Sequence, residues 1–233
     1  MKQFYQSILD YYKDKEYNDT VHVISLRKYN KVNYEKKYKT IVKVINEDTL
    51  DTALISGPST LLLNMGNDLI PGNNPFLVGA QEEDLFRRTN LHKALNYKYY
   101  PIHKKVILTK NIQVINKGLR QRYEKLENPQ TIDIITCASI KNDTFGTRLS
   151  PSNTNLMFDK IFSIFDIAHE HSYKKLVLSA FGCGGFACPP EHVSKIFKNI
   201  IDLFDGVFEE IIFAIFDENY PKSNYAIFKK NLL

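Results

Sequence analysis

The chain alternates short apolar runs rich in β-branched residues with longer stretches in which apolar residues recur at helical spacing. A run without polar alternation predicts a strand buried on both faces, and the amphipathic stretches predict helices that cover it. The predicted strands are residues 21–26, 40–45, 59–63, 105–108, 132–136, 176–180 and 210–216. The predicted helices lie in the first 17 residues and at 48–55, 82–95, 155–171, 190–204 and 223–230. This order predicts an α/β protein with helices on both faces of one sheet.

A charged, tyrosine-rich stretch from Arg27 to Lys39 interrupts this alternation. It has no clear period, which is typical of a surface connection. We therefore divide the chain into a helical and extended N-terminal extension, residues 1–40, and a main domain, residues 41–233. The two parts are expected to pack as one unit, because no internal repeat or linker separates them.

The composition is that of an ordinary globular protein, with 43% hydrophobic residues, 15 Phe, 14 Tyr and no Trp. The net charge of +5 permits an anionic partner, but the 31 basic residues are dispersed among 26 acidic ones. The densest basic stretches, residues 36–39 and 104–105, are expected to be solvated faces. Nucleic-acid binding is therefore not implied by charge alone.

The cysteines, the N-terminus and the histidines bear on compartment and metal binding. Cys137, Cys183 and Cys188 cannot form a fully paired framework, which favours a reducing, intracellular and cytoplasmic location. The first residues lack the apolar core of a secretion signal, and no run approaches the roughly 20 apolar residues of a membrane span. The six histidines show no metal-ligand spacing, and we expect a monomer with no metal, cofactor or membrane partner.

Two loops that follow predicted strands carry the candidate chemistry, since ligands of α/β sheets bind at the carboxyl ends of strands. The first belongs to the segment from Asn64 to Leu91 and contains Pro71-Gly72-Asn73-Asn74-Pro75. Glycine and asparagine tolerate positive φ, so this segment can turn backbone amides around an anion, although a plain turn-rich connection explains the same composition. Glu82 and Glu83 open the next helix, where carboxylates also suit the helix dipole.

The second loop is Phe181-Gly182-Cys183-Gly184-Gly185-Phe186, between a strand and a helix opened by proline. Three glycines in four positions would let backbone amides approach a pyrophosphate closely. A glycine-rich packing turn is the alternative, and Phe186 is either a core aromatic or a ligand contact. Cys183 has no histidine at a recognisable partner position, so it is not expected to be a nucleophile.

These two loops together resemble the microbial-type poly(ADP-ribose) glycohydrolase family. The segment from Asn64 to Leu91 is similar to the family signature, in which an asparagine-containing turn, a Pro-Gly-Gly-Gly loop and Gln-Glu-Glu follow one another. Gly-Cys-Gly-Gly-Phe at 182–186 is similar to the family's second phosphate-binding loop. The likeness runs from about Val42 to Phe228 and leaves out the N-terminal 40 residues.

The resemblance implies a macrodomain-like three-layer α/β/α fold with a mixed central sheet, and a glycohydrolase that needs no metal. By this resemblance Glu83 is the general acid at the O-glycosidic bond of ADP-ribose, and Glu82 holds ribose hydroxyls. The expected partners are ADP-ribose, or protein or nucleic acid that carries it. The expected ligand-binding residues are Asn64, Asn67, Gly72, Asn73, Asn74, Gln81, Gly182, Cys183, Gly184, Gly185 and Phe186.

One departure from the family pattern leaves the activity open. Asn73 and Asn74 stand where the family has glycines, and their side chains occupy space that relatives leave for the diphosphate. The alternatives to a hydrolase are therefore a module that reads ADP-ribose without cutting it, and a nucleotide-binding α/β protein unrelated to ADP-ribose.

Overall fold

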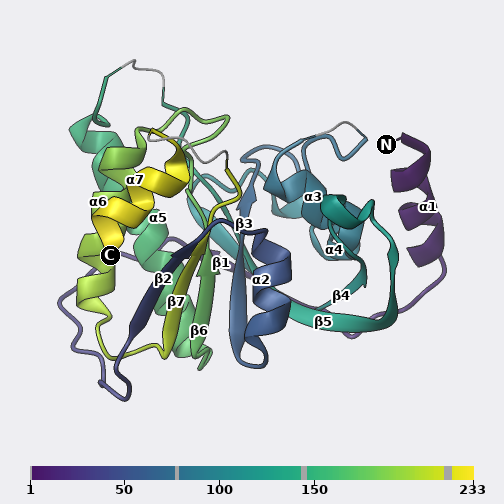
Figure 1. Cartoon of the computed structure of the whole chain (residues 1–233), viewed down its shortest axis with the longest axis horizontal. Coiled ribbons are helices and arrows are strands. Elements are labelled where there is room, and N and C mark those ends of the chain that lie inside the picture. Colours follow the sequence, from purple (N-terminus) through teal and green to yellow (C-terminus); the bar gives the residue numbers. More distant parts are fainter. Residues whose placement is uncertain (1, 77–78, 143–145, 218–221) are drawn as a thin grey trace.

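The computed structural model describes residues 2–76, 79–142, 146–217 and 222–233, and these residues form a seven-stranded mixed sheet between two layers of helices (Figure 1). The strand order is β1-β4-β5-β3-β6-β7-β2, with the five strands from β5 to β2 parallel and with β4 antiparallel to both β1 and β5. The strands are β1 Thr20–Ser25, β2 Ile41–Ile45, β3 Thr60–Gly66, β4 Lys105–Asn116, β5 Lys125–Ala138, β6 Lys175–Leu178 and β7 Glu210–Ala214.

Helices cover both faces of this sheet, as the hydrophobic pattern predicts. One layer holds α1 to α4 and the other α5 to α7, which lie on opposite sides of the strands in Figure 1. This arrangement confirms the expected three-layer α/β/α fold with a mixed sheet. The helices are α1 Lys2–Tyr12, α2 Thr49–Ser56, α3 Gln81–Arg88, α4 Leu91–Ala94, α5 Pro151–Glu170, α6 Pro190–Leu203 and α7 Asn224–Leu232, with short 3-10 turns η1 Tyr97–Tyr99 and η2 Leu119–Gln121.

The protein has two hydrophobic cores, one on each face of the sheet, because successive side chains of a central strand point to opposite faces. In β3, Leu61 and Leu63 pack with the core under α5 to α7, whereas Leu62 packs with the core under α1 to α4. All three side chains are fully buried. An apolar run without alternation is therefore what a strand covered on both faces requires.

The prediction of a single helix over residues 82–95 is wrong. Helix α3 ends at Arg88, and Thr89 is extended and forms a β-bridge with Val114 of β4. Asn90 continues this pairing, because its backbone N–H donates to the carbonyl of Gln113 at 3.1 Å and its side chain accepts from the N–H of Gln113 at 2.7 Å. Pairing with β4 therefore replaces helical hydrogen bonds at this point, and α4 starts separately.

Strands β4 and β5 are longer than predicted, with 12 and 14 residues. Their pairing shifts register between Thr109 and Ile112, and Asn111 takes a positive φ of 60° there. Such an irregularity breaks the apolar pattern that strand prediction relies on. Beyond it the hairpin curves away from the sheet, and its tip, residues 117–124, returns beside α3.

The stretch from Arg27 to Lys39 has neither helix nor strand, as expected for a connection, but it is anchored on the protein. The ring of Tyr34 stacks on Phe204 with centroids 4.2 Å apart, and its hydroxyl donates to Asp166 at 2.7 Å. Arg27 pairs with the same carboxylate at 2.6 Å. These contacts fix the connection against α5.

Replacing Tyr34 by Ala is expected to lower the free energy of unfolding by about 2 kcal/mol, because a stacked ring and a hydrogen bond are both lost. Chemical denaturation measures this difference. Tyr97→Ala serves as the control, since Tyr97 is 68% exposed and should change stability by less than about 0.5 kcal/mol. Equal effects of the two substitutions would show that Tyr34 does not anchor the connection.

Candidate active site

Gln81 ties the start of α3 to the end of β3. Its side-chain oxygen accepts from the backbone N–H of Met65 at 2.8 Å, and its amide donates to the carbonyl of Leu63 at 2.7 Å. The same amide reaches Thr49 of α2 at 3.1 Å. The first turn of α3 is thereby held at the carboxyl end of a central parallel strand, where α/β sheets bind ligands.

Glu82 is 3% exposed, and its carboxyl group accepts hydrogen bonds from the loop after β3. The backbone N–H of Asn67 donates to it at 2.8 Å, the side chain of Asn64 donates at 3.2 Å, and the backbone N–H of Gly72 donates as well. Burial raises the pKa of Glu82 to about 7, against these hydrogen bonds, which favour the charged form. The neighbouring charge of Glu83 raises it further.

Glu83 is 5% exposed and points to a different part of the same loop. The side-chain amide of Asn73 donates to its Oε1 at 2.7 Å. Gly79 packs directly against it, because a Cβ on Gly79 would lie 2.7 Å from the carboxyl carbon of Glu83. The two carboxyl groups therefore have separate partners, as expected for neighbours about 100° apart around a helix, and do not face each other across one bond.

Glycine is required at position 72, both by the backbone conformation there and by the side chain that packs against it. Its φ is +71°, and a Cβ there would lie 2.3 Å from the ring of Phe86 in α3. Asn73 also has a positive φ, of 45°, which asparagine tolerates better than most residues. Asn74 is exposed. The turn expected from composition is therefore present, and residues 77 and 78 of this segment lie outside the described residues.

The second loop lies across a cleft from the first, at the carboxyl edge of the sheet. Gly182 has a φ of +78°, and a Cβ there would lie 2.1 Å from the hydroxyl of Ser139, so this glycine closes a tight turn. Gly184 and Gly185 are exposed and face open space. Their backbones are free to approach a ligand in the way the sequence predicts.

Phe186 and Cys183 differ in their surroundings. Phe186 is half-buried and belongs to neither hydrophobic core, which disfavours the core-aromatic interpretation. Burial raises the pKa of the Cys183 thiol well above its usual range, and Cys188 adds to this effect. A thiol held in its neutral form is a poor nucleophile.

A cleft of about 400 Å³ lies between the two loops. Of the residues expected to bind ligand, Gln81 and Gly184 line it, as does Gly79, which packs against Glu83. The far end is formed by the turn after β2 and by the segment after β7. The other lining residues include Glu47, Asp48, Thr49, Ala80, Arg87, Arg120, Ser179, Ala180, Phe216 and Asp217.

The side chains of Asn64 and Asn67 are engaged within the protein. Asn64 is fully buried and donates to Glu82 and Thr136, both at 3.2 Å, while its Oδ1 has no hydrogen-bond partner among the described residues. The side-chain oxygen of Asn67 accepts from Leu69 and Ile70 in its own loop, at 2.8 and 3.1 Å. Both residues therefore shape the loop that surrounds Glu82.

An ion cluster in the wall of the cleft, centred on a buried arginine, was not found by sequence reasoning. The side chain of Arg88 is fully buried and pairs with Asp48 at 2.7 Å, with Asp84 at 3.2 Å and with Asp51. Burial acts to lower the pKa of Arg88, but the three carboxylates raise it above its ordinary value. Tyr123 of the hairpin tip donates to Asp84 at 2.8 Å. The cluster thus joins α2, α3 and the β4–β5 hairpin around the site.

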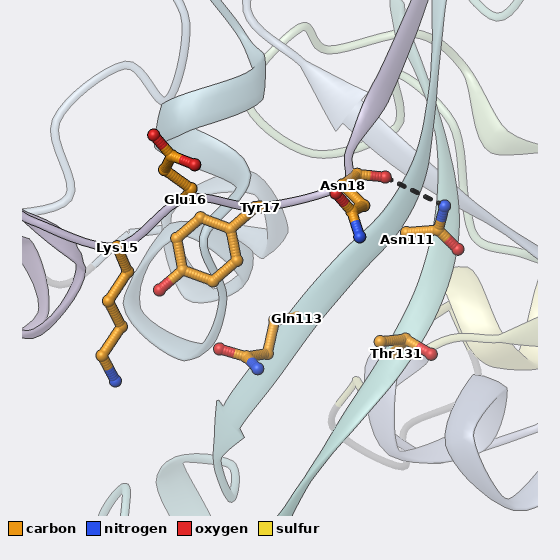
Figure 2. Close-up of a pocket in the computed structure, with 7 residues that line it drawn as sticks. All are labelled: Lys15, Glu16, Tyr17, Asn18, Asn111, Gln113 and Thr131. Atoms are coloured by element: carbon orange, nitrogen blue, oxygen red, sulfur yellow. Dashed lines mark hydrogen bonds between the residues drawn. The ribbon is translucent and has the colours of Figure 1, made fainter.

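A larger hollow of about 660 Å³ lies where the chain after α1 crosses β4 and β5 (Figure 2). Asn111 donates to the carbonyl of Asn18 there at 3.1 Å. Size alone would favour this hollow, but it contains neither the glycine-rich loops nor the paired carboxylates. Among the described residues no helix could span a membrane, and no group of three or more Cys, His, Asp and Glu is arranged to hold a metal ion.

The mixed sheet, the helices on both faces and the two glycine-rich loops at the carboxyl edge define a macrodomain-like α/β/α protein. Solved structures with this fold include poly(ADP-ribose) glycohydrolases from two bacteria. The enzyme from Thermomonospora curvata bound to the inhibitor ADP-HPD is 24% identical, with a TM-score of 0.73 over 82% of this chain and 78% of that one. The enzyme from Deinococcus radiodurans in complex with ADP-ribose is 22% identical, with a TM-score of 0.75 over 84% and 86%.

The sequence also resembles these glycohydrolases, over a defined region of the chain. Residues 4–115, just under half of the chain, match the family model for the catalytic domain of microbial-type PARG, the poly(ADP-ribose) glycohydrolases. This match confirms the resemblance inferred from Gln81-Glu82-Glu83. It begins at residue 4 and so includes N-terminal residues that the sequence analysis left outside the likeness. None of the curated protein sequences matches this chain.

The Arg88 cluster is expected to stabilise the protein because removing the buried cation leaves Asp48, Asp51 and Asp84 without their shared counter-ion. Arg88→Met should lower the free energy of unfolding at neutral pH by about 2–3 kcal/mol in chemical denaturation, since water screens the partly exposed Asp48 and Asp51. The control is Arg120→Met, since Arg120 pairs with Glu47 at the surface with 56% of its side chain exposed. That substitution should cost less than about 1 kcal/mol. A loss below 1 kcal/mol for Arg88→Met would contradict this account of the cluster.

Glu82 should make stability depend on pH. Its pKa is raised in the folded protein from 4.5 to about 7, so the folded state binds the proton more tightly than the unfolded state. Its contribution is fully present below pH 4.5 and is lost as pH rises through 7, by about 3 kcal/mol at most. Unfolding measured from pH 4.5 to 8 should therefore show a steeper decline for wild type than for Glu82→Gln. Parallel curves would show that Glu82 is not held in its neutral form.

Proposed function

We propose that this protein is an ADP-ribosyl glycohydrolase, which cleaves the O-glycosidic bond of ADP-ribose in poly(ADP-ribose) or on ADP-ribosylated macromolecules. The observation that carries the proposal is the placement of Gln81-Glu82-Glu83. This signature opens α3 at the edge of a cleft, with both carboxyl groups buried and directed to different partners. The family match over residues 4–115 supports the same activity.

The cleft suits a dinucleotide-sized ligand. Its volume of about 400 Å³ lies within the usual range of small-molecule sites. The exposed backbone of Gly184 and Gly185, next to the N-terminal end of α6, would receive the diphosphate. Gln81 would keep the first turn of α3 in place, and Asn74 and Phe186 would contact the ligand from the two loops.

Glu83 would act as the general acid. Cleavage breaks the bond between the anomeric carbon and the leaving oxygen through an oxocarbenium-like state. Glu83 donates its proton to the leaving oxygen, and then accepts a proton from the water whose oxygen joins the anomeric carbon. One water is consumed, and the carboxyl group ends in its starting form.

Glu82 would hold ribose hydroxyls of the departing unit, as the family resemblance implies. We also expect Glu82 to shape the site, because its hydrogen bonds fix the loop that carries Asn67 and Gly72. A carboxyl group with a pKa of about 7 has both protonation states populated near neutral pH, so it can donate or accept toward a hydroxyl.

We also propose that the whole chain packs as one unit. Residues 1–40 would form an extension that packs with the main domain, since β1 pairs with β4 and α1 packs against α3. We also place the protein in the cytoplasm as a monomer. Its three free cysteines support a reducing compartment.

Substituting Glu83 by Gln tests the activity. Wild type should release ADP-ribose from poly(ADP-ribose) or from mono-ADP-ribosylated protein, and the variant should be slower by at least about 100-fold because the acid is lost. Affinity for free ADP-ribose, measured by calorimetry, should change little. Binding of ADP-ribose by wild type without release from either substrate would instead support a reader module.

A further inference from the structure

The hollow beside β4 has a polar lining of its own, separate from the cleft at the start of α3 (Figure 2). Its volume is about 660 Å³, and its walls carry amide, hydroxyl, amine and carboxyl groups. The lining residues are Lys15, Glu16, Tyr17, Asn18, Asn111, Gln113 and Thr131. Amide and hydroxyl groups both donate and accept hydrogen bonds, so this lining suits a ligand that carries several hydroxyl groups.

Buried polar atoms without a hydrogen-bond partner gather at this hollow. The part of the chain that the structure describes contains seven, and four of them are the hydroxyl of Tyr17, Oε1 of Gln113, Nδ2 of Asn90 and Nδ1 of His92. The ring of Tyr12 joins them, since it lies 5.3 Å from that of Tyr17 and 5.5 Å from that of His92. The hydroxyl of Tyr12 donates to the carbonyl of Gln113 at 3.2 Å, and the N–H of Gln113 donates to Asn90 at 2.7 Å. Each unpartnered atom costs about 1–3 kcal/mol, which a bound molecule that supplies partners would recover.

A ligand in the hollow lies next to two of these atoms. Tyr17 and Gln113 line the hollow, and in Figure 2 the amide of Gln113 points toward the side that holds Tyr17 and Lys15. The terminal amide of glutamine rotates at low cost, so Oε1 can turn from its buried position toward a ligand. Burial raises the pKa of Tyr17 to about 12, so its hydroxyl keeps its proton and can donate.

Lysine side chains supply positive charge beside this polar lining. The Nζ atoms of Lys15 and Lys125 lie 3.3 and 5.1 Å from the ring centroid of Tyr11. Lys93 donates to the carbonyl of Lys13 at 3.0 Å. Within the described part of the chain, none of these four lysines forms an ion pair. Lysines without a carboxylate partner are available to bind a phosphate group.

The carboxylates near the hollow are directed elsewhere. Glu16 is the one carboxylate among the described residues that line it, and Figure 2 shows its side chain turned away from Lys15 and Gln113. Asp133 accepts from the N–H of Asn111 at 2.8 Å and from the hydroxyl of Tyr173 at 2.6 Å. The hollow therefore combines hydrogen-bonding groups for hydroxyls with positive charge for a phosphate.

We propose that this hollow is a second, non-catalytic site that binds the ribose phosphate of a nucleotide. The sugar hydroxyls lie at Tyr17 and Gln113. The phosphate lies at Lys15 and Lys125. Gln113 contacts Asn90 just beyond the C-terminal end of α3, whereas the paired carboxylates open this helix. The hollow is thus separate from the proposed active site, and its lining shares no residue with that of the cleft.

NMR titration with ribose 5-phosphate tests the site. The backbone amide signals of residues 15–18, 113 and 131 should shift. Half of the change should be reached at a concentration at least about tenfold below that needed with ribose or with inorganic phosphate, because both sets of contacts are made at once. No shift at these residues, or equal concentrations for ribose 5-phosphate and inorganic phosphate, overturns the proposal.

Lys15→Ala combined with Lys125→Ala should weaken this binding by about tenfold or more, since two contacts to the phosphate are lost. The matched control is Lys36→Ala combined with Lys198→Ala, which removes the same charge from lysines that pair with carboxylates elsewhere on the protein. The control should titrate as wild type does. Equal weakening in the two double variants would show an effect of net charge alone and overturns the proposal.

Poly(ADP-ribose) and free ADP-ribose distinguish two sources of the ribose phosphate, a further unit of a chain whose end occupies the cleft or a separate nucleotide. The polymer as source rests on the proposed function. In a Glu83→Gln background, which keeps the polymer intact, loss of Lys15 and Lys125 should weaken polymer binding by about tenfold. Weakening of a second ADP-ribose binding step alone assigns the site to the free nucleotide, and weakening of neither overturns it. Absence of ADP-ribose release by wild type overturns the proposed function, whereas the ribose 5-phosphate titration still decides the site.

Discussion

The carboxyl group of Glu82 is the point on which the geometry of the site depends. It is almost completely buried, and it collects hydrogen bonds from Asn64 at the end of β3 and from the backbones of Asn67 and Gly72 in the following loop. One side chain of α3 thereby fixes the loop at three points. Asn73, the residue after Gly72, donates to Glu83, so the same turn contacts both carboxyl groups.

This arrangement requires close packing as well as hydrogen bonds. A Cβ on Gly66 would lie 2.7 Å from Thr136 and 3.2 Å from Oε1 of Glu82, and the ring of Phe86 leaves no space for one on Gly72. Toward α2, Arg88 of the same helix pairs with Asp48 and Asp51. Helix α3 is therefore fixed toward both the loop and α2, which suits a site whose reacting group must be placed to within about half an ångström.

The sequence predicts the layers of the fold well and the outline of the site in part. Runs such as Leu61-Leu62-Leu63 have few alternatives to a strand covered on both faces. The break after Arg88 could not be predicted, because it depends on pairing of Asn90 with Gln113, more than twenty residues away. The full length of β4 could not be predicted either, since the irregularity at Asn111 interrupts its apolar pattern.

In the site, local composition indicated the two loops, and the resemblance singled out Gln81, Glu82 and Glu83. The cluster around Arg88 escaped because its carboxylates come from separate helices, and a buried arginine looks like any surface arginine in a sequence. The contact between Asn73 and Glu83 escaped as well, because a sequence does not show where an asparagine side chain points. From the sequence, Asn73 and Asn74 were expected to take space from a diphosphate. In the structure, the side chain of Asn73 instead donates to the carboxyl group of Glu83.

If the proposed function holds, ADP-ribose binds at the edge of the sheet at the start of α3, with its anomeric carbon next to Glu83. A crystal structure of the protein with ADP-ribose would decide this. We expect the diphosphate against the backbone of Gly182 to Gly185 and the distal ribose between that loop and Glu83. ADP-ribose bound only elsewhere, for example in the hollow beside β4, or turned so that its diphosphate lies against Glu83, would show that this placement is wrong.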